Sequence, residues 1–339
     1  MRQSTDAPRA ASRSRAVSRA HYAAALFFPF SGCYDRRMKT AAASMLASCL
    51  LLGSGSAAAD WFSDAEAGVF HDNNVTRGQL SSDIRSDTAA YASFTVGQFQ
   101  QFGDRTSISA SLNLQNQTFT RFSGLSNNSL GLSVSSKTKF GLGPEAPWAG
   151  VSVSATSLDH HDDLRDGWFF SYGVSGGTAL SERWKVRADY KREHRSMDQV
   201  TNTTLPAFVL TLAPGLRQLP GSVFDLHSHS LSLGAQFDYT DRIQFAFGYT
   251  RRTGDVESST NPTIAILRVS TALAPDPTFG PPFVAYKLDA DTNIYDVGFS
   301  YATSQRSSLN FSAQRNMSYA TGDTNYFSNV VRASFLYSF

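Results

Sequence analysis

Residues 106–115 read Thr-Ser-Ile-Ser-Ala-Ser-Leu-Asn-Leu-Gln, and this stretch decides the fold. Serine, asparagine and glutamine hold the polar positions, and the apolar residues fall at every second position between them: Ile108, Ala110, Leu112 and Leu114. An extended strand points successive side chains to opposite faces, so this alternation gives one apolar and one polar face. The pattern continues past both ends of the stretch and exceeds the roughly 5–6 residues of an ordinary soluble strand. It therefore predicts a long strand with one face in an apolar environment.

The same alternation recurs from Asp60 to the end of the chain. It predicts an all-β protein of about twelve strands, near residues 64–72, 87–101, 105–120, 128–140, 148–158, 167–180, 184–195, 226–240, 242–254, 288–302, 307–319 and 325–339. An even number of antiparallel strands is what a closed bacterial barrel requires. The sequence has no run of 18 apolar residues, so any membrane span is expected to consist of strands.

The connections between these strands alternate in length. The short ones lie at 102–105, 141–147, 181–183, 240–242 and 304–306, and the long ones at 73–86, 121–127, 159–166, 196–225 and 255–287. Membrane barrels combine short turns at one end with longer loops at the other, whereas a soluble sandwich has no reason to do so. The pattern predicts an antiparallel transmembrane β-barrel with both the N- and C-termini at the turn end, in the periplasm.

The segment before Asp60 has the features of a leader. Met38 and Lys39 precede an apolar stretch that ends at Leu52, and an A-x-A cleavage site follows, so residues 38–59 are predicted to be a secretory signal peptide. Residues 1–37 are rich in arginine and are interpreted as a mis-set start or an extended N-terminus. A transit peptide has similar chemistry but would not need a second complete signal behind it. The barrel is then expected to comprise residues 60–339.

Composition excludes several classes of function. The chain is 41% hydrophobic and 17% charged, which is not the composition of a disordered protein. Without the leader it holds 22 basic and 26 acidic residues, so the formal charge of +2 predicts no nucleic-acid binding. Cys33 and Cys49 both fall in the leader, which leaves no disulfide or thiolate site in the exported chain. Phosphate-binding glycine loops and the H-E-x-x-H motif are absent from the sequence, so no cofactor and no enzymatic activity are expected.

The final strand alternates to the last residue. Its apolar set is Phe327, Val331, Ala333, Phe335, Tyr337 and Phe339. In this feature the chain resembles the outer-membrane β-barrel superfamily, whose last strand typically ends in an aromatic residue. The resemblance implies an integral position in the bacterial outer membrane, in contact with lipid and lipopolysaccharide. It also implies that the barrel-assembly machinery recognises Tyr337 and Phe339.

A second resemblance lies at the first predicted strand. Residues 68–77 read Gly-Val-Phe-His-Asp-Asn-Asn-Val-Thr-Arg, which looks like the opening of β-barrel porins linked to polysaccharide export or surface-protein assembly. The match covers ten residues, so it supports the superfamily and names no solute.

In each predicted strand, the positions that alternate with the apolar residues form the polar face. Charged residues on this face are expected to line the lumen. Seven are basic, the predicted selectivity residues Lys137, Lys139, Lys185, Arg187, Lys191, Arg252 and Arg332, and four are acidic, Asp189, Glu193, Asp238 and Asp296. A wall lined with one sign of charge concentrates counter-ions, so a ladder of Lys185, Arg187 and Lys191 would favour anionic solutes. The alternative is that these cations pair with the four acids and fill a tight barrel. The sequence leaves both interpretations open.

Two loop features and one strand feature are further candidates. The connections 196–225 and 255–287 are rich in proline and apolar residues, and they either fold inward as a cap, pack on a partner, or extend the adjoining strands.

The run Asp159, His160, His161, Asp162 and Asp163 offers metal-ligand types, although contiguous ligands in a loop are not preorganised, so no metal site is predicted. His227 and Ser228 point to opposite faces of a strand and cannot form a nucleophile pair.

We therefore expect an outer-membrane channel or porin-like protein for small, anionic or sugar-like solutes. A non-conducting barrel for surface assembly, polysaccharide export or adhesion is the second hypothesis. A surface enzyme built on residues 159–163 is the third.

Overall fold

The computed structural model of the protein describes residues 60–198 and 219–339, so the predicted leader lies outside the described residues. Thirteen strands are present there: β1 (Asp60–Asp72), β2 (Asp87–Phe102), β3 (Thr106–Phe119), β4 (Asn127–Lys139), β5 (Trp148–His160), β6 (Gly167–Ala179), β7 (Trp184–Met197), β8 (His227–Asp238), β9 (Ile243–Thr260), β10 (Ala272–Pro275), β11 (Val284–Ala302), β12 (Ser307–Ala320) and β13 (Thr324–Ser338). The helical elements are short: η1 (Ser123–Leu125), η2 (Asp163–Arg165), α3 (Ile264–Val269), η3 (Pro277–Phe279) and η4 (Thr321–Asp323). No helix among the described residues is long and apolar enough to cross a membrane.

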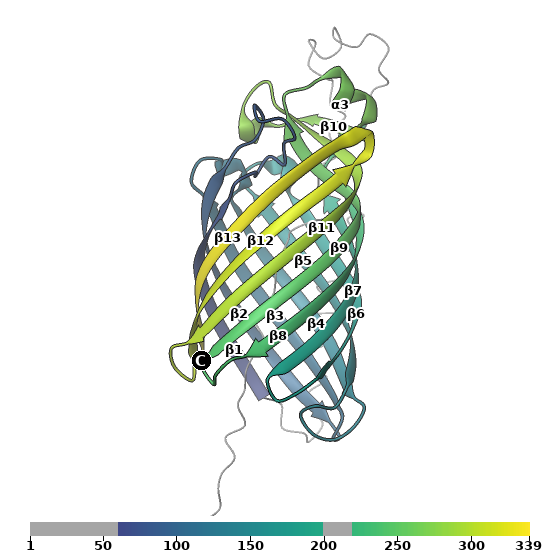
Figure 1. The fold of residues 1–339 in the computed structure, drawn as a ribbon. Coiled ribbons are helices and arrows are strands. Elements are labelled where there is room, and N and C mark those ends of the chain that lie inside the picture. The colour runs from purple at the N-terminus through teal and green to yellow at the C-terminus, as the bar shows by residue number, and fades with distance from the viewer. Residues whose placement is uncertain (1–59, 199–218) are drawn as a thin grey trace, which may run out of the picture.

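Twelve of these strands form a closed antiparallel barrel (Figure 1). Each strand pairs with its neighbours in chain order, and β13 returns to pair with β1 through Asp64 and Ser338. The remaining strand, β10, pairs only with the start of β11, where Ala272 faces Lys287 across the ladder. A closed barrel satisfies every ladder hydrogen bond without leaving an edge, which is the condition for strands to cross a membrane. The predicted antiparallel barrel of about twelve strands is confirmed.

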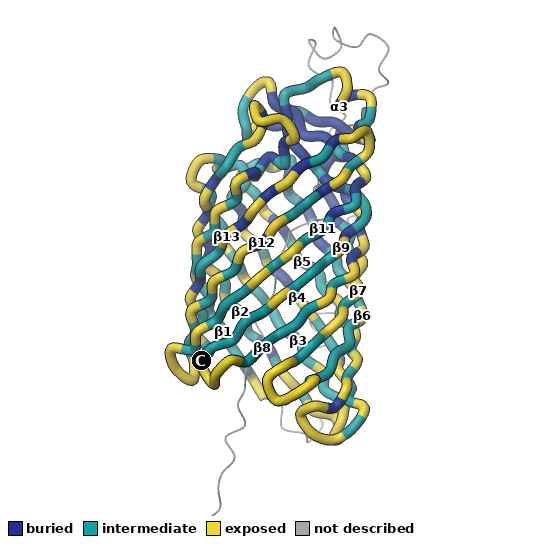
Figure 2. The backbone as a smooth tube through the Cα atoms, in the orientation of Figure 1, coloured by how far each residue is buried: buried dark blue, intermediate teal, exposed yellow. Residues whose placement is uncertain are grey.

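The two ends of the barrel differ. Short turns join β2 to β3, β4 to β5, β6 to β7, β8 to β9 and β11 to β12, and we call this end the turn end. Asp60, which begins β1, and the C-terminal Phe339, which follows β13, both lie at the turn end (Figure 1). At the opposite loop end, buried backbone is concentrated around the connections, whereas most of the barrel wall is half-buried or exposed (Figure 2).

The connection predicted at 255–287 is shorter than expected. β9 and β11 are the longest strands, with 18 and 19 residues, and they continue their pairing to Thr260 and Val284. In the extended part of these strands the pattern is reversed. The inner side chains, such as Val256 and Leu288, are apolar and buried, whereas outward positions such as Asp289 are polar. Inward folding and strand extension, which were alternatives at the level of sequence, therefore both occur in this segment.

Candidate functional site: the lumen and its cap

Cross-strand hydrogen bonds identify the inner face of the barrel. Ser109 and Ser111 on β3 meet Ser135 and Ser133 on β4, each pair with 2.8 Å between the hydroxyl oxygens. The inner positions of the next two strands, β5 and β6, also carry small residues. We call the whole set the Ser/Gly wall: Ser109, Ser111, Ser133, Ser135, Gly150, Ser152, Ser154, Ser171, Gly173, Ser175 and Gly177. One side of the lumen is therefore lined with hydroxyls and short side chains.

Long inner side chains lie along the wall, over glycines of neighbouring strands. A Cβ added at Gly177 would come within 3.1 Å of the Trp148 indole, and one at Gly234 within 3.3 Å of the Arg187 side chain. Lys191 covers Gly173 in the same way, since an added Cβ there would lie 2.9 Å from its Cγ. These glycines leave room for the large side chains to lie flat against the wall.

Three of the seven predicted selectivity residues lie close to inner carboxylates. The Lys185 Nζ is 2.7 Å from Asp238, the Arg187 Nε is 3.2 Å from Asp189, and the Arg252 Nε is 3.9 Å from Glu193. Their positive charge is largely offset at short range. Of the predicted ladder, Lys185 and Arg187 therefore belong to the cross-paired network that was the alternative interpretation.

The other four cations have no ion pair within residues 60–198 and 219–339: Lys137, Lys139, Lys191 and Arg332. Lys137 and Lys191 are exposed although they point inward, which shows that solvent reaches the lumen at their level. Arg332 instead rests on aromatic faces, with its guanidinium 5.6 Å from the Phe70 ring centroid and 5.2 Å from that of Tyr91. The inner wall thus keeps uncompensated positive charge on β4, β7 and β13.

The sequence prediction left out the inner acids of β1, among them Asp64 and Glu66. Asp64 and Glu66 on β1 share the inner parity with Phe70, and Glu66 accepts a 2.7 Å hydrogen bond from the Tyr91 hydroxyl. Their strand carries alanines at the outward positions Ala65 and Ala67, so the apolar face that marks parity elsewhere is weak there. The register of β13 against β1 supplies the information that the sequence lacked.

A packed apolar core lies at the loop end. Leu267 of α3 and Leu273 of β10 are at most 1% exposed and pack against inner residues of β9, β11 and β13, among them Tyr286 and Tyr326. On the opposite side, Phe224 packs with Met197, and Leu226 with Phe169. Burying one such side chain contributes about 1.5–3 kcal/mol. We call the residues of this end, 219–226 and 261–283 with η1 and η2, the cap.

Charged side chains tie the cap together beneath the apolar core. Arg165 of η2 donates to Asp276 of the β10–β11 connection over 2.8 Å, and Asp276 also accepts from Ser259. The Arg165 guanidinium stacks over the Phe224 ring at 4.4 Å, and that of Arg195 lies 5.2 Å from the same ring. Arg165 and Asp276 are almost fully buried, so they depend on each other for charge compensation.

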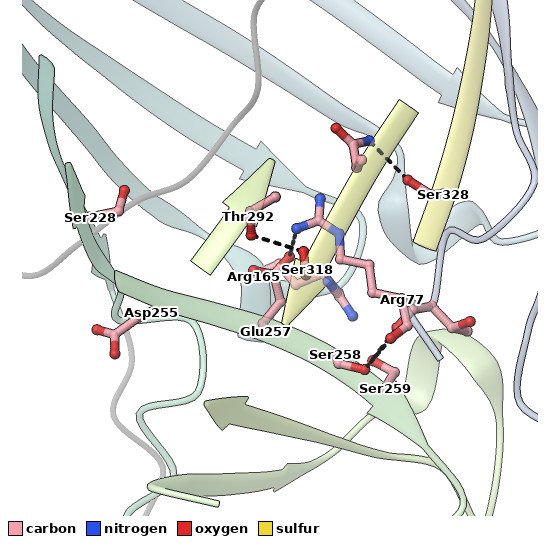
Figure 3. A network of polar contacts seen from close by, with 12 residues as sticks. Arg77, Arg165, Ser228, Asp255, Glu257, Ser258, Ser259, Thr292, Ser318 and Ser328 are labelled. Atoms are coloured by element: carbon pink, nitrogen blue, oxygen red, sulfur yellow. Dashed lines mark hydrogen bonds and ion pairs between the residues drawn. The ribbon is translucent and has the colours of Figure 1, made fainter. Parts of the chain in front are cut away.

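The connection between β1 and β2 joins the same assembly from the far side of the mouth. Arg77 lies 3.6 Å from Glu257, and its carbonyl oxygen accepts a hydrogen bond from Ser258 (Figure 3). Asp83 in this connection accepts hydrogen bonds from Thr260 and Asn261. Below them, hydroxyls of neighbouring strands bond to each other, as Thr292 does to Ser318 (Figure 3). Loops distant in sequence therefore meet over the lumen, with the β9–β11 connection at the centre.

Residues of the acidic and histidine run at 159–163 make contacts within the cap. Asp159 faces outward and His160 inward on β5, so the two cannot bind one ion. Asp162 accepts hydrogen bonds from the Leu164 backbone and the Thr278 hydroxyl, and it lies 3.6 Å from Arg165. No group of metal-ligand residues capable of holding an ion occurs in the described part of the chain.

The outer face carries an apolar band bounded by polar residues. On β13 the outward positions from Val331 to Phe339 are apolar, nine residues that match the roughly 9–11 a tilted strand needs to cross a bilayer. Aromatic side chains gather at the turn-end border, including Trp61, Phe102 and Tyr239. Polar side chains begin at the other border, for example Arg192 on β7, His229 on β8 and Arg251 on β9. The described part of the chain therefore has the build of a membrane-spanning β-barrel.

Comparison with known proteins finds only distant likenesses of fold. No family model matches the chain, and no curated protein matches it. Among solved structures, an outer membrane channel from Pseudomonas putida F1 shares 11% identity with a TM-score of 0.48, covering 84% of this chain and 98% of that one. The outer membrane channel DcaP of Acinetobacter baumannii shares 9% identity with a TM-score of 0.40, covering 91% and 100%. The anion-selective porin from Comamonas acidovorans shares 8% identity with a TM-score of 0.37, covering 84% and 100%. At these values the likenesses do not indicate which solute this barrel handles.

Proposed function

We propose that this barrel is a passive outer-membrane channel for small hydrophilic anions, with its turn end in the periplasm and its loop end at the cell surface. The observation that carries the proposal is the Ser/Gly wall flanked by Lys137 on β4 and Lys191 on β7, two exposed inner cations without carboxylate partners. Uncompensated charge on a low-dielectric wall attracts counter-ions and raises their local concentration. The serine hydroxyls supply donors and acceptors for a hydrated or sugar-like solute.

The cap gives this channel a closed state. In this proposal its buried core and the Arg165–Asp276 pair are what hold the loop end shut. Loops of this length at a barrel mouth are commonly functional rather than passive connections. In the proposal the cap is a gate that must open for solutes to pass.

The same cap favours one alternative, a non-conducting barrel that presents its loops for surface assembly, polysaccharide export or adhesion. In that case the buried core would be a permanent plug. No contact described here assigns a chemical step to any residue, and an enzymatic function is not proposed.

Planar-bilayer recording of refolded residues 60–339 separates the two functions. We expect brief anion-preferring openings from the unmodified barrel and longer ones when Asp276→Asn weakens the cap. Lys137→Glu with Lys191→Glu is expected to reverse or abolish the anion preference, whereas Arg251→Glu on the outer face is the matched control and should leave it unchanged. If the barrel is folded and heat-modifiable but silent even with Asp276→Asn, the channel proposal is wrong and the plug is permanent.

A further inference from the structure

On the inner wall between β4 and β7, the hydroxyl-lined part near the turn end carries an aromatic side chain, Trp148. Trp148 begins β5 on the inner parity, in register with Lys139 on one side and Gly177 on the other. Its indole covers Gly177, and the Lys137 Nζ lies 4.2 Å from the ring centroid. The ring is partly exposed, so it is a surface of the lumen rather than part of a packed core.

We infer that Trp148, Ser175, Lys137 and Lys191 form a binding subsite for an anionic sugar in the lumen. The inference deepens the proposed channel function, on which it rests, by naming the solute class and the residues that hold it. None of the four residues belongs to the cap.

The four side chains lie along one short strip of wall. Ser175 stands on β6 between Gly173 and Gly177, the two glycines covered by Lys191 and Trp148. The two glycines are four positions apart along β6, which is about 13 Å at 3.3 Å per residue. A solute lying along β6 would therefore meet an indole at one end, a hydroxyl in the middle and an ammonium group at the other end.

Each part of the strip matches one part of an anionic sugar. The apolar C–H face of a pyranose ring packs on an aromatic face, its hydroxyls bond to Ser175 and neighbouring serines, and its carboxylate pairs with an ammonium group. In the empty barrel the Lys137 ammonium rests over the indole, a cation–π contact worth about 0.5–1 kcal/mol at an exposed site. An entering carboxylate offers that ammonium a stronger, charge-assisted partner, which frees the ring face for the sugar.

A purely structural role explains less of this arrangement. A cation–π pair between Lys137 and Trp148 needs neither Lys191 nor a hydroxyl-lined strip beside it. Cations that served only stability would be expected to pair with acids, as Lys185 does with Asp238.

Calorimetric titration of the refolded barrel with digalacturonate tests the inference, and the neutral disaccharide lactose is the matched probe. We expect saturable binding of digalacturonate, weak or absent binding of lactose, and about tenfold weaker binding for each of Trp148→Ala and Lys191→Ala, equivalent to about 1.4 kcal/mol. Trp184→Ala, which removes an outward indole at the same end of the barrel, should leave the affinity unchanged.

The controls distinguish this inference from the channel proposal. Because Trp148→Ala also removes the lysine's resting contact, Trp148→Phe is included: it keeps an aromatic face and should retain most of the affinity. Equal affinities for the charged and neutral sugars, or unchanged affinity in Trp148→Ala, would overturn the subsite. Anion currents that persist without any digalacturonate binding would overturn the subsite alone and leave the channel in place.

Discussion

Arg165 and Asp276 lie 2.8 Å apart across the mouth of the barrel, although 111 residues separate them in the chain. Arg165 belongs to η2, between β5 and β6, and Asp276 precedes η3, between β10 and β11. Both side chains are buried, at 7% and 1% exposure. This pair joins the same two loops as the hydrogen bond from Thr278 to Asp162, and because both of its charges are buried it makes the cap sensitive to a single substitution.

Asp276→Asn is predicted to open the cap and destabilise the loop end. Removing the Asp276 charge leaves Asp162, at 3.6 Å, as the remaining carboxylate beside the buried Arg165, and breaking a buried ion pair typically costs about 3–5 kcal/mol. Longer channel openings in a bilayer, together with faster protease cleavage of the cap and an intact barrel on heat-modifiability gels, are the expected results. The double variant Arg165→Met with Asp276→Leu keeps volume without charge and should stay closed. Openings of equal length in Asp276→Asn and the unmodified protein would contradict the role of the pair.

Charge reversal is predicted to matter more at unpaired cations than at paired ones. Lys185→Glu sets a carboxylate beside Asp238, whose charge already offsets that of Lys185, so we expect mainly a loss of stability and a small change in ion selectivity. Lys191→Glu changes an exposed inner charge that has no carboxylate within 4.0 Å among the described residues. Reversal potentials measured under a salt gradient compare the two variants. A larger shift from Lys185→Glu would show that the cross-paired network, not the free lysines, sets the selectivity.

Gly234→Leu is predicted to narrow the lumen without preventing folding. The Arg187 side chain lies over Gly234, and a Cβ at this position would meet only the flexible Cγ, Cδ and Nε of that arginine, at 3.3–3.8 Å. A leucine there displaces Arg187 toward the axis of the barrel and away from Asp189. We expect unit conductance to fall while the strand content measured by circular dichroism is retained. Gly103→Leu, at an exposed turn where nothing lies within 4 Å, is unsuitable as a control because its φ of +60° disfavours a side chain. Ala188→Leu, on the outer face of β7, is the matched alternative.

Phe339→Ala is predicted to slow assembly in cells and to leave the folded barrel almost unchanged. Phe339 is 66% exposed, and its ring has edge contacts with Phe94 at 6.3 Å and Tyr337 at 5.0 Å. Little apolar area is lost with it, so detergent refolding and melting should stay close to those of the unmodified protein. The amount of folded barrel in outer-membrane fractions is expected to drop several-fold. Unchanged amounts there would show that the terminal aromatic residue is not read during assembly.

The barrel strands could be predicted from sequence because the physics that forms them is local in sequence. Lipid on one side and solvent on the other impose a period of two, and the alternation at 105–120 corresponds to β3 at Thr106–Phe119. The predicted inner face also agrees with the register, which pairs Lys185, Arg187 and Lys191 with Gln236, Gly234 and Ser230 of β8. Where the outward residues are small, as at Ala65 and Ala67 on β1, the signal weakened and the inner acids were overlooked.

The cap could not be predicted beyond its apolar composition. The partners of Asp276 are Arg165, 111 residues away, and Ser259, 17 residues away, and no periodic pattern records such contacts. The same holds for the ion pairs of the lumen, since parity places Lys185 and Asp238 on one face but does not show that they touch. Register across strands decides which charges cancel and which remain.

The cap has consequences for how the channel would open. A loop held by scattered surface contacts loosens gradually, whereas the apolar core around Leu267 and Leu273 and the Arg165–Asp276 pair lose their contacts together. Opening of this barrel is therefore expected to be cooperative, with current appearing in discrete all-or-none steps rather than as a graded leak. The dwell time of the closed state would then report the stability of a small hydrophobic core, and warming or denaturant would lengthen openings well before the strands of the barrel unfold.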